Sequence, residues 1–251
     1  KTKNGTRNSG SKVDKGYIGH KAAKMMQRSK SIEQRQQNAI EEKSKLLKNI
    51  ETSESLKIAQ LPYHKTQLAE FDRVSIHYGE KQVCQEISFT IERGDRIVLT
   101  GRNGSGKSSI LKLLCGEDIS YSGTVRQGSQ LKISYVSQQT SWLQGNLTDF
   151  AREHDIDESL FKAILRKLDF SRLQFEKDMA DYSGGQKKKV LIAKSLCEKA
   201  HLLVWDEPLN FIDVISRMQI EDLLLSYEPT ILFVEHDREF CERIATKHVQ
   251  L

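Results

Sequence analysis

A glycine-rich loop between an apolar run and a helical segment constrains the fold of this chain more than any other feature. The loop Gly101-Arg102-Asn103-Gly104-Ser105-Gly106-Lys107-Ser108 matches the pattern G-x-x-x-x-G-K-[ST] in full. The apolar run Ile97-Val98-Leu99 precedes it, and a helix is predicted from Ser109 to Leu114. Glycines let the backbone curl so that successive N–H groups face phosphate oxygens, and the helix N-terminus favours anions. We therefore predict an α/β fold that holds a nucleotide at this loop.

The end of the loop carries the side chains that a nucleotide and its metal ion need. Lys107 can reach the β- and γ-phosphates, and the hydroxyl of Ser108 can coordinate Mg²⁺. The residues expected to contact the nucleotide here are Gly101, Arg102, Asn103, Gly104, Ser105, Gly106, Lys107, Ser108 and Ser109.

The hydrophobic pattern on both sides of the loop is that of an α/β domain. Continuous apolar runs are typical of buried parallel strands, and strict alternation is typical of strands with one solvated face. A helix-rich, strand-poor subdomain is expected at about residues 139–185. The predicted strands are Leu68–Tyr78, Ile87–Ile91, Leu202–Trp205 and Ile231–Val234, and the later predicted helices are Gln186–Lys199 and Val214–Ser226.

Two adjacent carboxylates, Asp206 and Glu207, end one of these apolar runs. Side chains at the end of a buried parallel strand emerge at the carboxyl edge of the sheet, where ligands bind in α/β folds. There, one carboxylate can orient the coordination shell of Mg²⁺ while the next polarises the attacking water. The alternative, a solvated Asp-Glu turn, explains neither the apolar run before the pair nor the phosphate loop upstream.

The N-terminal segment differs in charge from the rest of the chain. Residues 1–60 hold 14 Lys and Arg against 6 Asp and Glu, whereas the remainder holds 25 against 28. His20 to Leu56 contains no Pro or Gly and favours a helix. Met25, Ile32, Ala39 and Leu46 recur every seven residues, which predicts a coiled-coil-type helix with one apolar seam. We predict a basic loop and linker helix over 1–60, with a polyanionic partner; a solvated surface helix is the alternative.

The spacing of the cysteines and the hydropathy indicate the cellular compartment. Cys84, Cys115, Cys197 and Cys241 stand far apart, without the clustering of a disulfide framework or a zinc site. They are expected to be reduced thiols, which favours a cytoplasmic protein. The sequence has no run of 18 apolar residues, so no membrane span is predicted.

A second motif gives the chain a family resemblance. Tyr182-Ser183-Gly184-Gly185-Gln186 resembles the signature sequence of ATP-binding cassette (ABC) ATPases, and it precedes Asp206-Glu207 as in that family. The resemblance covers roughly residues 68–251 and implies that 64–251 form an α/β P-loop ABC cassette with a mixed sheet core and a helical subdomain. The predicted basic helix would precede this cassette. ATP and Mg²⁺ become the expected cofactors.

The resemblance also implies a role for each matching residue. Tyr78 would stack on adenine, and Gln138 would sense Mg²⁺ and the γ-phosphate. Asp206 matches the metal-orienting carboxylate, Glu207 the catalytic base, and Asp213 the aspartate of the D-loop. His236 would contact the γ-phosphate. The expected catalytic residues are thus Gln138, Asp206, Glu207 and His236, and the metal ligands are Ser108, Gln138 and Asp206.

In that family the signature residues complete a nucleotide site held mainly by another cassette. Ser183, Gly184, Gly185 and Gln186 would therefore serve ATP bound elsewhere, and a second cassette is an expected partner. The resemblance implies slow hydrolysis unless two cassettes pair.

The stretch from Glu207 to Asp213 narrows the resemblance further. Glu-Pro-Leu-Asn-Phe-Ile-Asp is similar to the Glu-Pro-Thr-Asn-His-Leu-Asp of ABC-F proteins, with Leu209 and Phe211 as departures that resemble its antibiotic-resistance branch. Residues 1–60 resemble the distal part of the hairpin that joins the two cassettes of such proteins and enters the ribosome. The cations that would face rRNA or tRNA backbone are Lys21, Lys24, Arg28, Lys30 and Arg35.

The resemblance thus implies an ATPase that acts on the ribosome and confers resistance to antibiotics bound near the peptidyl transferase centre. An ABC-F translation factor for stalled ribosomes is one alternative. The ATP-binding subunit of a membrane transporter and a chromosome or repair ATPase with a coiled coil are the others.

Overall fold

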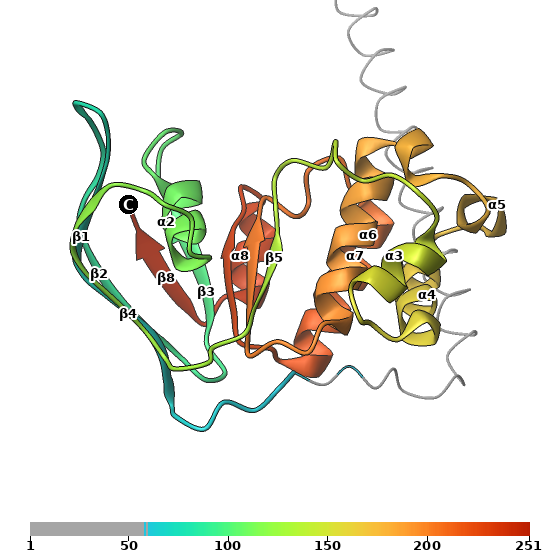
Figure 1. Ribbon diagram of the computed structural model, residues 1–251, viewed down its shortest axis with the longest axis horizontal. Helices are drawn as coiled ribbons and strands as arrows, with labels where there is room; N and C mark the ends of the chain where they lie inside the picture. Colours follow the sequence, from blue (N-terminus) through green and yellow to red (C-terminus); the bar gives the residue numbers. More distant parts are fainter. Residues whose placement is uncertain (1–57, 59) are drawn as a thin grey trace, which may run out of the picture. The chain divides into compact units, whose positions relative to one another are not determined.

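The computed structural model describes Ile58 and residues 60–251 (Figure 1). These residues fall in the second of the two compact units of the chain, Ser55–Leu251. The predicted basic loop and linker helix over residues 1–60 lie almost wholly outside the described residues, and that prediction stays open.

A parallel sheet of five strands runs in the order β5-β6-β7-β3-β8. Every residue of its central strands β6 and β7 is buried, which is why their sequences read as continuous apolar runs. The bounds are β3 Arg96–Thr100, β5 Ile133–Val136, β6 Leu202–Asp206, β7 Ile231–Val234 and β8 Lys247–Gln250.

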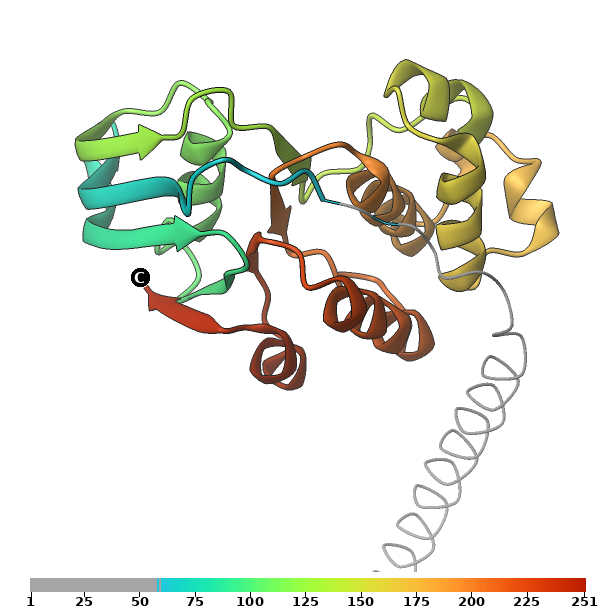
Figure 2. The same ribbon diagram turned by 90° about the horizontal axis from the view of Figure 1, so that it is seen from below.

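A second sheet contains three antiparallel strands in the order β2-β1-β4. Figure 2 shows these strands, drawn from cyan to green, side by side. Their bounds are β1 Gln67–Tyr78, β2 Lys81–Glu92 and β4 Tyr121–Gln127. The predicted α/β fold is confirmed, and its parallel and antiparallel strands are divided between these two sheets.

Helix α2 (Lys107–Leu114) lies between the two sheets (Figure 1). Its Ile110, Leu111 and Leu114 belong to one hydrophobic core with strand residues of both sheets. The loop that precedes α2 is thereby fixed at the end of β3, because the helix it opens is packed on two sides.

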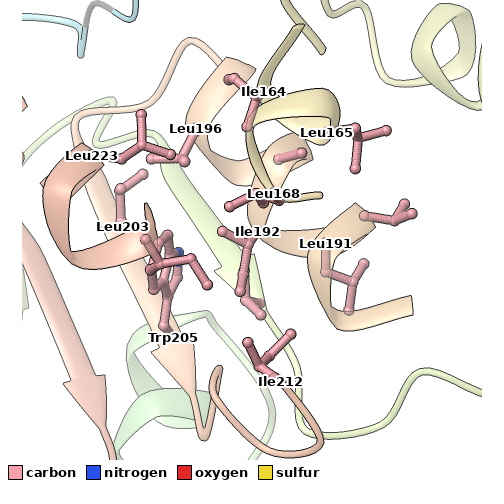
Figure 3. Packing of buried hydrophobic residues seen from close by; sticks show 14 of the residues in the cluster. Ile164, Leu165, Leu168, Leu191, Ile192, Leu196, Leu203, Trp205, Ile212 and Leu223 are labelled. Atoms are coloured by element: carbon pink, nitrogen blue, oxygen red, sulfur yellow. The ribbon is translucent and has the colours of Figure 1, made fainter. Parts of the chain in front are cut away.

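The opposite face of the parallel sheet carries the other helices and a second core. Leu203 and Trp205 of β6 point into this core, whereas Leu202 and Val204 point toward α2. Figure 3 shows Trp205 packed among side chains of α4, α6 and α7. The helices are α3 Leu147–Glu153, α4 Glu158–Lys167, α5 Arg172–Phe175, α6 Gly184–Cys197, α7 Val214–Tyr227 and α8 Arg238–Ile244, with a 3-10 turn η1 at Met179–Asp181.

Between β5 and α6 the described chain is helical, without a strand. Its buried side chains, including Phe150, Phe161 and Ile164, join the core beneath α6 and α7. The segment about 139–185 therefore lies on the side of the sheet opposite α2, with its helix α4 packed against α6.

Candidate functional site

Four loops leave the parallel sheet at the same edge. The strand register pairs Val136 with Trp205, Asp206 with Val234, and Leu99 with Val234. Because parallel strands end together, the residues that follow them are neighbours. The topology thus gathers the loop at Gly101, Gln138, Glu207 and His236, although more than 100 residues separate Gly101 from His236.

The loop has the backbone that its glycines predict. Gly101, Gly104 and Gly106 all have positive φ, at 149°, 79° and 92°. A Cβ at Gly101 would lie 2.7 Å from the Ser105 hydroxyl and from the carbonyl oxygen of Leu251, so a side chain there would displace the loop.

Lys107 is buried at the first turn of α2, and its amine is held within the loop. Nζ donates to the carbonyl oxygens of Gly101 at 3.0 Å and Arg102 at 2.9 Å. A cavity of about 320 Å³ opens beside it, with Gly101, Lys107 and His236 in its lining. A larger cavity of about 530 Å³ at Tyr63 and His201 contains none of the predicted site residues.

The side-chain oxygens of Ser108 and Asp206 lie next to each other. The Ser108 hydroxyl donates to Oδ1 of Asp206 at 3.1 Å. Burial raises the pKa of Asp206, whereas the hydrogen bond from Ser108 lowers it. This donor set fits Mg²⁺, which commonly takes one or two carboxylates and completes its shell with water and substrate phosphates. The buried Ser105 hydroxyl, without a hydrogen-bond partner among the described residues, fits a loop built to face a polar ligand.

Glu207 is the centre of a hydrogen-bonded group that includes two other predicted site residues. Its carboxylate accepts from Nε2 of Gln138 at 2.9 Å and from Nδ2 of Asn210 at 2.5 Å. Nε2 of His236 lies 3.3 Å from the other carboxylate oxygen. Glu207 has φ 48°, a conformation that non-glycine residues adopt rarely and that turns the chain sharply after β6.

Tyr78 lies beside the first turn of α2. Its hydroxyl is 3.0 Å from the hydroxyl of Ser109, and its ring is half exposed. The ring is thus available for stacking at the outer side of the loop, as an adenine contact requires.

The signature segment forms the start of α6 and stands apart from these groups. Ser183 is the N-cap: its side chain accepts from the N–H of Gln186 at 3.3 Å, and the Gln186 side chain accepts from the N–H of Ser183 at 2.9 Å. Within the described residues, none of its hydrogen bonds runs to Gly101–Ser108. A Cβ at Gly185 would lie 2.3 Å from the carbonyl oxygen of Phe211, so the two segments touch through their backbones.

Glu235 and Lys189 are the first two residues around this site that the sequence pattern did not single out. The Glu235 carboxylate accepts from the backbone N–H groups of Leu209 at 3.1 Å and His236 at 2.7 Å, which joins the loops after β6 and β7. Its position next to His236 was the available signal. Lys189 pairs with Asp213 at 2.8 Å, a contact that no sequence pattern announces.

Lys188 is the third missed residue and is buried beneath the site. Its Nζ donates to the carbonyl oxygens of Ser137 at 2.8 Å and Asp206 at 3.2 Å. Burial lowers the pKa of Lys188 to about 8, although the carboxylates of Asp206, Glu207 and Glu235 raise it. The amine is therefore under the electrostatic influence of three carboxylates at this edge of the sheet.

The fold and this geometry define a P-loop nucleotide-binding domain. The family model described as "ABC transporter" matches residues 84–210. The chain belongs to this family and carries its ATP-binding domain.

Curated relatives are similar over most of the chain. "ATP-binding protein Uup" of Caulobacter vibrioides is 32% identical over 193 residues, which are 73% of this chain and 32% of that protein. "ATP-binding protein Uup-like" of Haemophilus influenzae is 34% identical over 186 residues, 71% of this chain and 40% of the relative. "Ribosome protection protein VmlR" of Bacillus subtilis is 31% identical over 188 residues, 72% of this chain and 34% of the relative. The chain thus spans about a third of the length of the curated relatives it matches.

One further finding bears on the predicted absence of a membrane span. Within the part of the chain that the structure describes, no helix combines the length and the apolar character that crossing a bilayer requires.

Proposed function

We propose that this chain is a hydrolytic ATP-binding cassette of an ABC-F protein that works on the ribosome. The observation that carries the hydrolytic part is the position of Glu207. Its carboxylate is held by Gln138, Asn210 and His236, directly after the Asp206 that pairs with Ser108. A fixed carboxylate beside a phosphate loop is suited to take a proton from an attacking water.

The other residues would bind and orient ATP and its metal ion. Gly101–Ser108 would surround the phosphates, Lys107 would turn toward them, and Tyr78 would stack on the adenine. Ser108, Asp206 and the amide oxygen of Gln138 would hold Mg²⁺, since the Nε2 of Gln138 already donates to Glu207. When bound, Mg²⁺ neutralises charge on the phosphates. His236, which lies against the other carboxylate oxygen of Glu207, would donate to the γ-phosphate.

The site is proposed to be composite. Ser183, Gly184, Gly185 and Gln186 lie at the N-terminus of α6, where backbone N–H groups favour anions. Because their hydrogen bonds do not run to the loop of the same chain, we infer that they act on ATP held by a second cassette. Closure of two cassettes would exclude bulk water and place these donors against the phosphoryl charge.

The ribosomal role rests on three features of the sequence and one relative. Leu209 and Phe211 match the resistance branch of ABC-F proteins, and residues 1–60 carry the excess of Lys and Arg. A relative with 31% identity is named a ribosome protection protein. We propose that this chain protects ribosomes, and that it does so against antibiotics, in the cytoplasm, with the basic segment against nucleic-acid phosphates.

The hydrolytic proposal is tested with Glu207→Gln in the whole protein. The variant is expected to bind ATP like the parent and to lower turnover by about a hundredfold or more, since a general base contributes about that factor. Nucleotide binding and phosphate release are measured on the same preparations. Fast turnover by this single cassette alone, in a sample shown to be monomeric, would contradict the composite site.

The ribosomal proposal is tested by co-sedimentation and by drug tolerance. Binding to ribosomes is expected to weaken steeply as salt rises, because phosphate contacts release counterions. Salt-independent binding would count against such contacts. Expression in a susceptible bacterium should raise tolerance to a ribosome-targeting antibiotic, and Glu207→Gln serves as the inactive control. Ribosome binding without any tolerance would favour the translation-factor alternative.

A further inference from the structure

Lys188 makes an unusual set of contacts for a lysine on a helix. Its side chain is 1% exposed, although it lies between Lys187 and Lys189 in a run of three lysines. Its amine donates to two backbone carbonyl oxygens, those of Ser137 and Asp206. Burying an ammonium group is unfavourable unless hydrogen bonds and opposite charges compensate. Here both are present, since the amine makes two hydrogen bonds and the carboxylates of Asp206, Glu207 and Glu235 favour its charged form.

The two carbonyls belong to the residues immediately before Gln138 and Glu207. These two side chains are themselves joined by a hydrogen bond of 2.9 Å. Lys188 therefore fixes the backbone on both sides of this pair, one carbonyl at the end of β5 and the other at the end of β6. Removing the amine would leave the carbonyl oxygens of the half-buried Ser137 and the buried Asp206 without this charged donor.

The same side chain starts from the helix that carries the signature segment. Lys188 lies in the second turn of α6, five residues after the N-cap Ser183. Within the described residues, its amine thus joins the start of α6 to the loops that hold the proposed catalytic base. A shift of α6 along its axis would pull on Ser137 and Asp206 together.

We propose that Lys188 is a positioning residue that fixes the Gln138–Glu207 pair relative to the signature helix. This inference assumes the proposed composite mechanism. On that mechanism, Lys188 links the residues around the ATP held by this cassette to the signature segment, which contacts the ATP held by the second cassette. Lys188 contacts main chain, so it acts through Gln138 and Glu207 and not on the nucleotide.

The test compares Lys188→Met with Lys187→Met in the whole protein. Methionine keeps much of the length and apolar volume of lysine and removes the amine. Lys187 is half-buried on the same helix and serves as the matched control. Lys188→Gln is made in parallel, so that a variant with a polar side chain is at hand if Lys188→Met fails to fold.

The first readout is amide hydrogen exchange without nucleotide. Around Ser137 and Asp206, both Lys188 variants are expected to exchange about tenfold faster than the control, in line with the loss of a hydrogen bond from a charged donor. The second is ATP turnover per bound nucleotide, which is expected to fall about tenfold while the dissociation constant for ATP stays within about threefold.

Each outcome decides the inference. Exchange and turnover equal to those of Lys187→Met would overturn it, and so would equal loss of binding and turnover, which indicates general destabilisation. If the parent protein hydrolyses no ATP, the proposed function fails, and the exchange comparison still decides whether Lys188 holds the two loops.

Discussion

Gly185 is the residue at which the signature segment and the loop after β6 touch. A Cβ there would lie 2.3 Å from the carbonyl oxygen of Phe211, a distance that forces the backbone to move. A Cβ at Gly184 would meet the Phe211 ring at 3.4 Å, an ordinary van der Waals contact, and Phe211 is 83% exposed. A side chain should therefore be tolerated better at Gly184 than at Gly185.

Gly185→Ala is expected to lower the free energy of unfolding by about 1–3 kcal/mol, the range for overpacking. Gly184→Ala is the matched control and should stay within about 1 kcal/mol of the parent, because alanine favours the helix. Urea unfolding of both variants measures the difference. Equal effects would mean that the close approach of Phe211 does not limit this position.

At the scale of elements, Asp213 connects α6 to α7. It caps α7 by accepting from the N–H of Ser216 at 2.9 Å, and it pairs with Lys189 of α6 at 2.8 Å. Although burial raises it, the pKa of Asp213 is held at about 2 by the hydrogen bonds from Lys189 and Ser216. The carboxylate is thus stabilised in its charged form in the folded protein.

The lowered pKa of Asp213 makes the stability of the folded protein depend on pH. Asp213 contributes stability above the ordinary aspartate pKa of about 3.9, and this contribution is lost as the pH falls toward about 2. The side chain is 50% exposed, so solvent screening limits the contribution to about 1 kcal/mol.

Asp213→Asn is expected to be less stable than the parent by that amount at pH 7, and the gap should narrow as the pH is lowered below about 4. Unfolding in urea at several pH values measures it. Lys189→Met and the double variant complete a cycle that isolates the pair. A gap that does not change with pH would exclude the ion pair as its source.

For the whole molecule, Trp205 joins the parallel sheet to the helical side. It is fully buried among apolar side chains (Figure 3). Its Nε1 donates to the Ser195 hydroxyl of α6 at 2.8 Å. The Ser134 hydroxyl of β5 lies 2.8 Å from the same hydroxyl. The residue after Trp205 is Asp206, so the core and the site share one strand end.

Trp205→Phe is expected to lower the free energy of unfolding by about 1–3 kcal/mol, through the lost hydrogen bond and the space left by the smaller ring. Trp142→Phe is the control, since Trp142 is 50% exposed and the change should stay within about 0.5 kcal/mol. Thermal or urea unfolding compares them. A smaller effect at Trp205 than at Trp142 would contradict its role in the core.

The fold was predictable from the sequence where local pattern and burial agree. The runs at Leu202–Trp205 and Ile231–Val234 became β6 and β7 because a strand buried on both faces needs apolar residues throughout. The edge strand β8 and the short helix α8 were not predicted. Lys-His-Val-Gln in β8 has little apolar pattern, and the β3 residues with which it pairs are about 150 residues away in sequence.

The sequence by itself determined the loop Gly101–Ser108, the Asp206–Glu207 pair and the signature at Ser183–Gln186, because each depends on residue types within a few positions. Tertiary structure alone decided that Lys188 of the run 187–189 donates to the carbonyls beneath the site, and that Glu235 joins two loops. The physical reason is that these contacts are made between elements: Lys188 reaches carbonyls 51 and 18 residues away, and only the packing of α6 on the sheet brings them within a hydrogen bond.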